Sequence, residues 1–143
     1  MLTQKGLLAV GAILGATALT YVLTSSDGPV SPAQAQGDAL VAIALPDALS
    51  HEAAIGARMF DAKCASCHGE NAVGRDGLAP PLVHIIYEPN HHGDESFQPA
   101  VALGVRAHHL RFGNMPAVEG LTRADVAMIT THIREPQRAN GIF

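Results

Sequence analysis

The chain has 143 residues, of which 48% are hydrophobic and only 15% charged, a size that suits one domain with an additional segment. Nine basic and thirteen acidic side chains give a formal net charge of −4, which argues against a general nucleic-acid-binding protein because such proteins usually carry a basic patch. Aromatic residues make up 4% and tryptophan is absent, so a small domain has little material for a core and would gain from the apolar bulk of a cofactor.

The N-terminal residues 1–24 are predicted to form a hydrophobic helix. Residues 6–23 follow Lys5 and carry no charge. As a helix they would be roughly 27 Å long, close to the hydrocarbon core of a bilayer of about 30 Å. The pattern fits either a secretory signal cleaved after the Ala-Gln-Ala pattern at residues 33–35 or an uncleaved membrane anchor, which the long apolar run favours. Both alternatives place the rest of the chain in the periplasm, anchored to the inner membrane or soluble, with Lys5 on the cytoplasmic side.

Residues 25–49 are predicted to form a flexible tether, because they are rich in proline, glycine, serine and alanine. The apolar residues 39–45 within it are also compatible with an extended segment that lies over the domain, and no pattern in the sequence decides between the two. The folded domain is expected over residues 50–143.

The first helix of this domain is predicted to begin after Ser50, a good N-cap, and to run into Cys64. Gly56 and Phe60 are four residues apart and therefore lie on one face of this helix. Residues 69–82 are punctuated by glycine and proline, a composition that predicts a loop.

Two further helices are predicted after this loop. A middle helix begins at Asp94 or Ser96 and ends before Gly104. The last helix begins after Thr122, which an aspartate follows three residues later in a variant of the capping box, and Pro136 is expected to end it. No stretch shows the alternating pattern of a strand, so the sequence predicts an all-α domain with long loops.

The motif CASCH, residues 64–68, contains both cysteines of the chain. A zinc site would need more ligands at suitable spacing, a thioredoxin-like pair would need a preceding strand, and a disulfide within the motif would close a very tight loop. Cys-x-x-Cys-His is the signature of covalent c-type haem attachment. On one helical turn, Cys64, Cys67 and His68 share a face, so two thioethers and an axial imidazole can reach the same haem. The predicted export of the chain agrees with this interpretation.

Met115 is predicted to be the second axial ligand of the haem iron. It lies in RFGNMPAV, after a glycine that permits an unusual backbone turn and before a proline that stiffens the chain. Met59 lies one helical turn before the motif, on the wrong side to reach across the haem ring. Met128 lies next to the apolar stripe of the last helix and is better interpreted as a core residue. His108 or His109 is the alternative ligand. Ligation by histidine and methionine raises the reduction potential.

From about residue 50 to 135, the domain resembles the class I cytochromes c, which are small monohaem electron carriers. The resemblance rests on a glycine and a phenylalanine four residues apart before the haem motif, and on CASCHG, APPL, GNMP and the final IREP. It implies a cytochrome c-like helical domain around one covalently attached haem c.

The resemblance also implies roles for individual residues. The carbonyl of Pro80 is expected to accept a hydrogen bond from His68, and Leu82 is expected to pack on the haem plane. The first and last helices are expected to cross at Gly56. The sequence departs from the family at His132, where an aromatic residue is usual, so the crossing is expected to be looser or more polar.

The remaining histidines of the domain are not needed for this arrangement; they are His84, His91, His92, His108 and His109. They are interpreted as surface and loop residues, some of them bonded to haem propionates. A second metal site is the alternative, with copper as a metal that imidazole suits.

Together these features predict a periplasmic one-electron carrier with a haem held by His68 and Met115. The expected partners are redox proteins, either an oxidase or a reductase, together with the membrane if the N-terminal helix is uncleaved; nucleic acid is not expected. No enzymatic activity is predicted, because both axial positions are filled. The alternatives are a haem-based sensor or ligand binder with a labile sixth position, and an electron-delivery subunit of a larger membrane complex.

Overall fold

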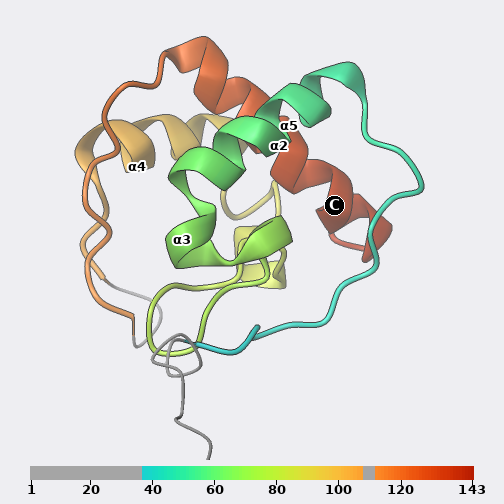
Figure 1. Ribbon diagram of the computed structural model, residues 1–143, viewed down its shortest axis with the longest axis horizontal. Coiled ribbons are helices and arrows are strands. Elements are labelled where there is room, and N and C mark those ends of the chain that lie inside the picture. The colour runs from blue at the N-terminus through green and yellow to red at the C-terminus, as the bar shows by residue number, and fades with distance from the viewer. Residues whose placement is uncertain (1–36, 108–111) are drawn as a thin grey trace, which may run out of the picture. The chain divides into compact units, whose positions relative to one another are not determined.

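The computed structural model describes residues 37–107 and 112–143 (Figure 1). The α-helices in these ranges are α2 (His51–Lys63), α3 (Ala65–His68), α4 (Phe97–Leu103) and α5 (Arg123–Ala139), and the 3-10 helices are η2 (Glu70–Ala72), η3 (Ile85–Tyr87) and η4 (Asp94–Ser96). Within these residues the β-structure consists of two isolated antiparallel bridges, Arg75 with Ala79 and Val105 with Met115. The described domain is therefore helical, as predicted.

The hydrophobic helix predicted within residues 1–24 lies outside the described residues. None of the helices in the described ranges combines the length and the apolar character needed to cross a membrane.

Helix α2 has the borders that the sequence predicts. Ser50 caps it, because its Oγ accepts a hydrogen bond of 3.1 Å from the N–H of Ala53. At the other end, the N–H of Cys64 donates to the carbonyl of Phe60 at 2.7 Å. Its buried face comprises Ala53, Gly56 and Phe60, and this face packs against α5.

Helices α2 and α5 cross each other (Figure 1). Gly56 of α2 lies at the contact, against the backbone of Met128 and Ile129. A Cβ atom on Gly56 would lie 1.9 Å from the carbonyl oxygen of Met128, so no larger residue fits without separating the helices. The ring centroid of the buried Phe60 lies 5.4 Å from that of His132. The crossing is therefore close, and its polar element is His132, whose buried Nδ1 has no hydrogen-bond partner in the described part of the chain.

Helix α5 begins as predicted but does not end as predicted. In the capping box, the N–H of Thr122 donates to Asp125 Oδ2 at 2.8 Å, and the N–H of Asp125 donates to Thr122 Oγ1 at 3.2 Å. The predicted end at Pro136 is wrong, because the helix continues to Ala139. The carbonyl of Pro136 accepts hydrogen bonds from the N–H and the Nδ2 of Asn140, at 3.1 and 2.8 Å, which closes the last turn.

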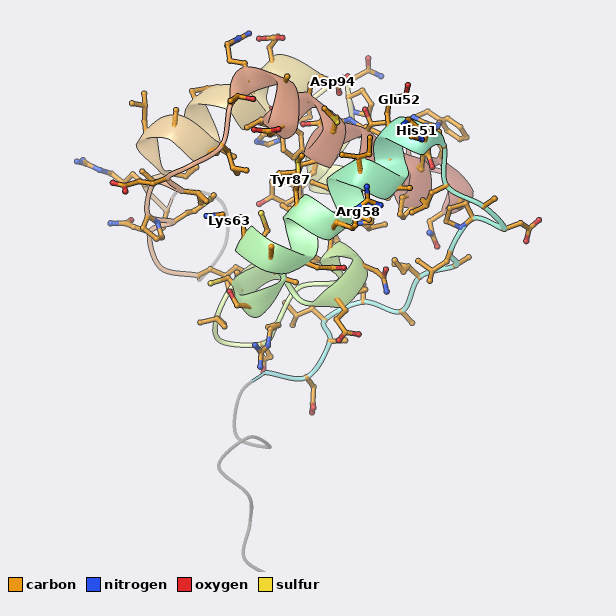
Figure 2. All side chains as sticks on the ribbon, turned by 45° about the horizontal axis from the view of Figure 1, so that its top comes forward. His51, Glu52, Arg58, Lys63, Tyr87 and Asp94 are labelled. Atoms are coloured by element: carbon orange, nitrogen blue, oxygen red, sulfur yellow. The ribbon has the colours of Figure 1, made fainter. Side chains whose placement is uncertain are left out.

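Two buried polar side chains connect α5 to the segment between η2 and η4. Gln137 is fully buried, and its Nε2 donates to the carbonyls of Leu82 at 2.7 Å and Tyr87 at 3.1 Å. Arg134 donates through Nη1 to the carbonyl of Tyr87 at 2.6 Å and through Nε to Asp94 at 2.8 Å (Tyr87 and Asp94 are labelled in Figure 2). These bonds replace backbone–water hydrogen bonds that the segment would otherwise need.

The predicted middle helix is present in two pieces. The 3-10 helix η4 covers Asp94 to Ser96, and α4 follows it and ends at Gly104, as expected. The segment of residues 112–122 contains no helix and leads to the start of α5 (Figure 1). It is tied to α2 by Lys63, whose Nζ donates to the carbonyl of Glu119 at 3.3 Å (Lys63 is labelled in Figure 2).

Residues 37–49, predicted as part of a flexible tether, are held along the surface of the domain (Figure 1). The N–H of Leu40 donates to the carbonyl of Val73 at 3.2 Å, and Ile43 packs against the hydrophobic core. The structure therefore shows the extended alternative for this segment. The folded domain begins before residue 50, because tertiary contacts compensate for the weak local preferences of the segment.

The central core cluster of the described residues is formed mainly by aliphatic side chains. The cluster consists of Phe60, Ala72, Val83, Ile129 and Ile133. It lies between α2, α5 and the segment between η2 and η3, and only one of its members is aromatic.

Candidate haem site

Both cysteines lie at the junction of α2 and α3. Cys64 separates the two helices, and Cys67 lies within α3. The two sulfurs form no disulfide with each other; Cys64 is half-buried and Cys67 is exposed. Burial raises the pKa of the Cys64 thiol to about 11, with a smaller contribution from the nearby Cys67. Before haem attachment, the Cys64 sulfur is therefore a protonated thiol at neutral pH, and this form is a poor nucleophile.

His68 is the buried member of the motif, with 8% of its surface exposed. Its Nδ1 lies 2.9 Å from the carbonyl oxygen of Pro80, the contact that the resemblance implies. Because a carbonyl oxygen can only accept, Nδ1 carries the proton and Nε2 is left with a lone pair for a metal. Burial lowers the pKa of His68, and the weaker opposing effect is the bond to Pro80. The ring is thus neutral at neutral pH, which is the metal-binding form.

The loop that follows the motif folds back over it. The N–H of Gly74 donates to the carbonyl of His68 at 2.6 Å. Arg75 donates through Nη1 to the carbonyl of Ser66 at 2.7 Å. These bonds, together with the fixed φ of the proline pair that starts at Pro80, bring the Pro80 carbonyl to the imidazole.

The backbone around Met115 is fixed by neighbouring residues. Val105 and Met115 exchange two backbone hydrogen bonds, each of 2.9 Å. Gly104 has a φ of +76°, and a Cβ there would lie 2.4 Å from the carbonyl oxygen of Met115, so only glycine allows this approach. Asn114 Oδ1 accepts a hydrogen bond of 2.9 Å from the N–H of Ala107. The half-buried Met115 is therefore held by an antiparallel bridge that lies before α5.

Met59 and Leu82 are partly buried and pack against the core cluster, as Cys64 does. The packing of Leu82 on the haem plane stays a prediction. Met128 is half-buried on α5, with its carbonyl at the helix crossing. His108 and His109, the alternative sixth ligands, lie outside the described residues.

The histidines considered for a second metal make local contacts instead. His84 Nδ1 accepts a hydrogen bond of 3.2 Å from the N–H of Ile86, and His92 Nδ1 lies 2.6 Å from the carbonyl of the same residue. The rings of His91 and His92 are 4.6 Å apart. Within residues 37–107 and 112–143, no group of three or more histidine, cysteine, aspartate or glutamate side chains is placed to hold a metal ion. The copper hypothesis therefore has no support from the described residues.

Sequence reasoning did not find the residues that hold the Pro80 loop from outside. Gln137 is one of them, and its position offered a signal, since it continues the stripe of α5 four residues after Ile133. A polar residue in a buried stripe indicates a structural hydrogen bond. For the contact between residues 37–45 and this loop the sequence contained no comparable signal.

The described residues fit a covalently attached haem. Two unpaired thiols lie one helical turn apart, and next to them is a neutral imidazole that an Nδ1 hydrogen bond orients. The family model for cytochrome c matches residues 53–136, which is more than half of the chain and includes the haem motif and Met115. No curated protein and no solved structure matches the chain. The chain belongs to the cytochrome c family and carries a covalently bound c-type haem.

Proposed function

We propose that this protein is a one-electron carrier of the class I type, with its haem iron held by His68 and Met115. Membership of the cytochrome c family supports haem-based electron transfer in general. The observation that carries the finer proposal is that the Met115 backbone is held in place by two hydrogen bonds with Val105 and by its close approach to Gly104. A ligand held in this way changes position little between oxidation states, which suits a carrier.

When bound, the haem supplies a one-electron couple; the protein's residues supply its environment. His68 keeps its proton on Nδ1 through the bond to Pro80, which orients the ring and increases the basicity of Nε2. The thioether of Met115 is a weak donor and raises the reduction potential. Neither residue has to gain or lose a proton when an electron is transferred.

The proposed location is the periplasmic side of the bacterial inner membrane, and it rests on the apolar N-terminal sequence. We expect transient contacts of modest area with an oxidase or reductase. An uncleaved anchor would raise the effective concentration of the carrier near such membrane partners.

The test is a comparison of the protein with its Met115→Ala variant, both matured in a host with a working haem-attachment system. The unmodified protein should show a methionine–iron charge-transfer band and bind carbon monoxide slowly. In Met115→Ala the band should disappear, carbon monoxide should bind quickly, and the reduction potential should fall by on the order of 0.1 V, within the range of about 0.8 V that axial ligands span.

Met128→Leu is the matched control, since Met128 lies on α5 near the helix crossing. It should keep the band. An unmodified protein without the band and with rapid carbon monoxide binding would favour the sensor or ligand-binding alternative. Stable co-purification with a membrane complex would favour the electron-delivery subunit.

A further inference from the structure

The structure contains two segments that lie outside the family match over residues 53–136 and contact each other. One comprises residues 37–45, here called the N-terminal strap, and the other residues 137–142. The strap runs from the loop that follows α3 to the C-terminal end of α5 (Figure 1).

At its first end, the strap is hydrogen-bonded to the loop that carries Pro80. The N–H of Leu40 donates to the carbonyl of Val73 at 3.2 Å, and the N–H of Asp76 donates to the carbonyl of Asp38 at 3.0 Å. Both hydrogen bonds are made by backbone atoms. They therefore restrain the backbone conformation of the loop and not only its side chains.

At its second end, the strap is fixed to α5 by an asparagine. The N–H of Ala44 donates to Asn140 Oδ1 at 2.9 Å, and Asn140 Nδ2 donates to the carbonyl of Ala44 at 2.8 Å. Asn140 Nδ2 also donates to the carbonyl of Pro136 at 2.8 Å. Between the two ends, Ile43 packs against the core cluster, as does Ile142 from the C-terminal segment.

The loop is held on its far side as well, and it contacts the proximal histidine. The buried Gln137 donates to the carbonyl of Leu82 at 2.7 Å, two residues after Pro80. The N–H of Gly74 donates to the carbonyl of His68 at 2.6 Å, and Gly74 lies between the two residues that the strap bonds. A displacement of the strap therefore acts on both the loop and the motif.

We propose that the N-terminal strap, fastened by Asn140, positions the Pro80 carbonyl and so sets the strength of its hydrogen bond with Nδ1 of His68. A stronger bond at Nδ1 makes the imidazole a better donor and favours the oxidised iron. The strap thereby tunes the reduction potential from outside the family core. This inference rests on the proposed function, and its residues are positioning residues that do not touch the haem ligands directly.

The test uses the full chain matured with haem and three variants. Ile43→Ala removes a strap side chain that packs on the core, and Asn140→Ala removes the side chain that bonds the strap to the end of α5. Leu45→Ala is the matched control, because Leu45 lies on the same strap and is 54% exposed.

Two quantities are measured: the hydrogen-exchange rate of the His68 Nδ1 proton by NMR in the reduced protein, and the reduction potential. In Ile43→Ala and Asn140→Ala, exchange should accelerate by about tenfold or more. The potential should rise in both variants, and Leu45→Ala should change neither quantity.

Val126→Ala separates positioning from general destabilisation, since the buried Val126 lies at the far end of α5. The effects of Ile43→Ala and Val126→Ala on the reduction potential and on His68 exchange are compared at equal loss of unfolding free energy. If the effects of Ile43→Ala are no larger than those of Val126→Ala, the inference is wrong. The sixth ligand is checked on the same samples by the methionine–iron band. A missing band would contradict the proposed function, while the His68 exchange rate would still decide whether the strap acts on Pro80.

Discussion

His132 occupies the position where the resemblance to class I cytochromes c implies an aromatic residue. It is 4% exposed at the crossing of α2 and α5, beside the ring of Phe60, and its Nδ1 has no partner within the described ranges. Burial lowers the pKa of His132, and the charges of Asp61 on α2 and Glu135 on α5 oppose this effect. The folded protein therefore holds a neutral imidazole where an unfolded chain would take up a proton more readily.

We expect the free energy of unfolding to fall on acidification because of this residue. The folded pKa is depressed, so the stabilisation is present above the unfolded value of 6.5 and is lost as the pH falls through the folded pKa. His132→Phe keeps an aromatic ring beside Phe60 without the titration. Denaturant unfolding is measured between about pH 7 and about pH 4. As the pH falls, the free energy of unfolding of the variant should increase relative to that of the unmodified protein. His68 is common to both proteins, so its contribution cancels, and parallel pH profiles would show that His132 is not responsible.

At the scale of elements, the arrangement depends on how closely α2 approaches α5. Gly56 allows the contact with the carbonyl of Met128, and Ser50 and Thr122 determine where the two helices begin. The caps act within one turn, whereas the approach at Gly56 involves residues far apart in the chain. The junction that carries Cys64 follows directly from α2, so the crossing also determines where the haem motif lies.

Gly56→Ala should destabilise the protein despite the better helix propensity of alanine. Propensity alone would stabilise α2 by about 1 kcal/mol. The new Cβ would lie 1.9 Å from the Met128 oxygen, and the overlap should cost more, with a net loss of about 1–3 kcal/mol. The measurement is denaturant unfolding of the haem-loaded protein. Gly93→Ala is the control, since its Cβ would meet only the Pro89 oxygen at 3.6 Å; an equal effect of both substitutions would contradict the argument.

At the scale of the whole molecule, the domain has little apolar material of its own. Its buried cluster contains five residues, and Phe60 is the aromatic one among them. Polar contacts also hold the elements together. The side chains of Arg134 and Gln137 on α5 donate hydrogen bonds to the segment between η2 and η4. A covalently attached haem adds a large apolar group to such a fold, and we expect much of the stability to depend on it.

A variant that lacks both attachment cysteines, Cys64→Ser with Cys67→Ser, should therefore be far less stable. We expect a loss of about 3 kcal/mol or more and a broad thermal transition, followed by circular dichroism. Ser66→Ala is the matched control within the motif and should retain the haem and a cooperative transition. A sharp transition at an unchanged midpoint in the double variant would mean that the polypeptide folds on its own.

The sequence by itself determined the features whose chemistry lies within a few residues. These are the caps at Ser50 and Thr122, the end of α4 at Gly104 and the haem motif at residues 64–68. In each case a side chain, or the lack of one at glycine, affects only the backbone within its own turn. The feature can therefore be predicted from the sequence without knowledge of the tertiary structure. Met115 was likewise singled out by its glycine and proline neighbours, and its role as a ligand stays a prediction.

Only the tertiary structure decided what depends on contacts between distant residues. Proline at position 136 predicts the end of a helix, but the side chain of Asn140 closes a further turn. A composition typical of a tether predicts flexibility, but the backbone of Ala44 both donates to and accepts from the side chain of Asn140, 96 residues further along the chain. Local preferences of this kind are worth only a little free energy per residue, and burial and long-range hydrogen bonds outweigh them once the chain is folded.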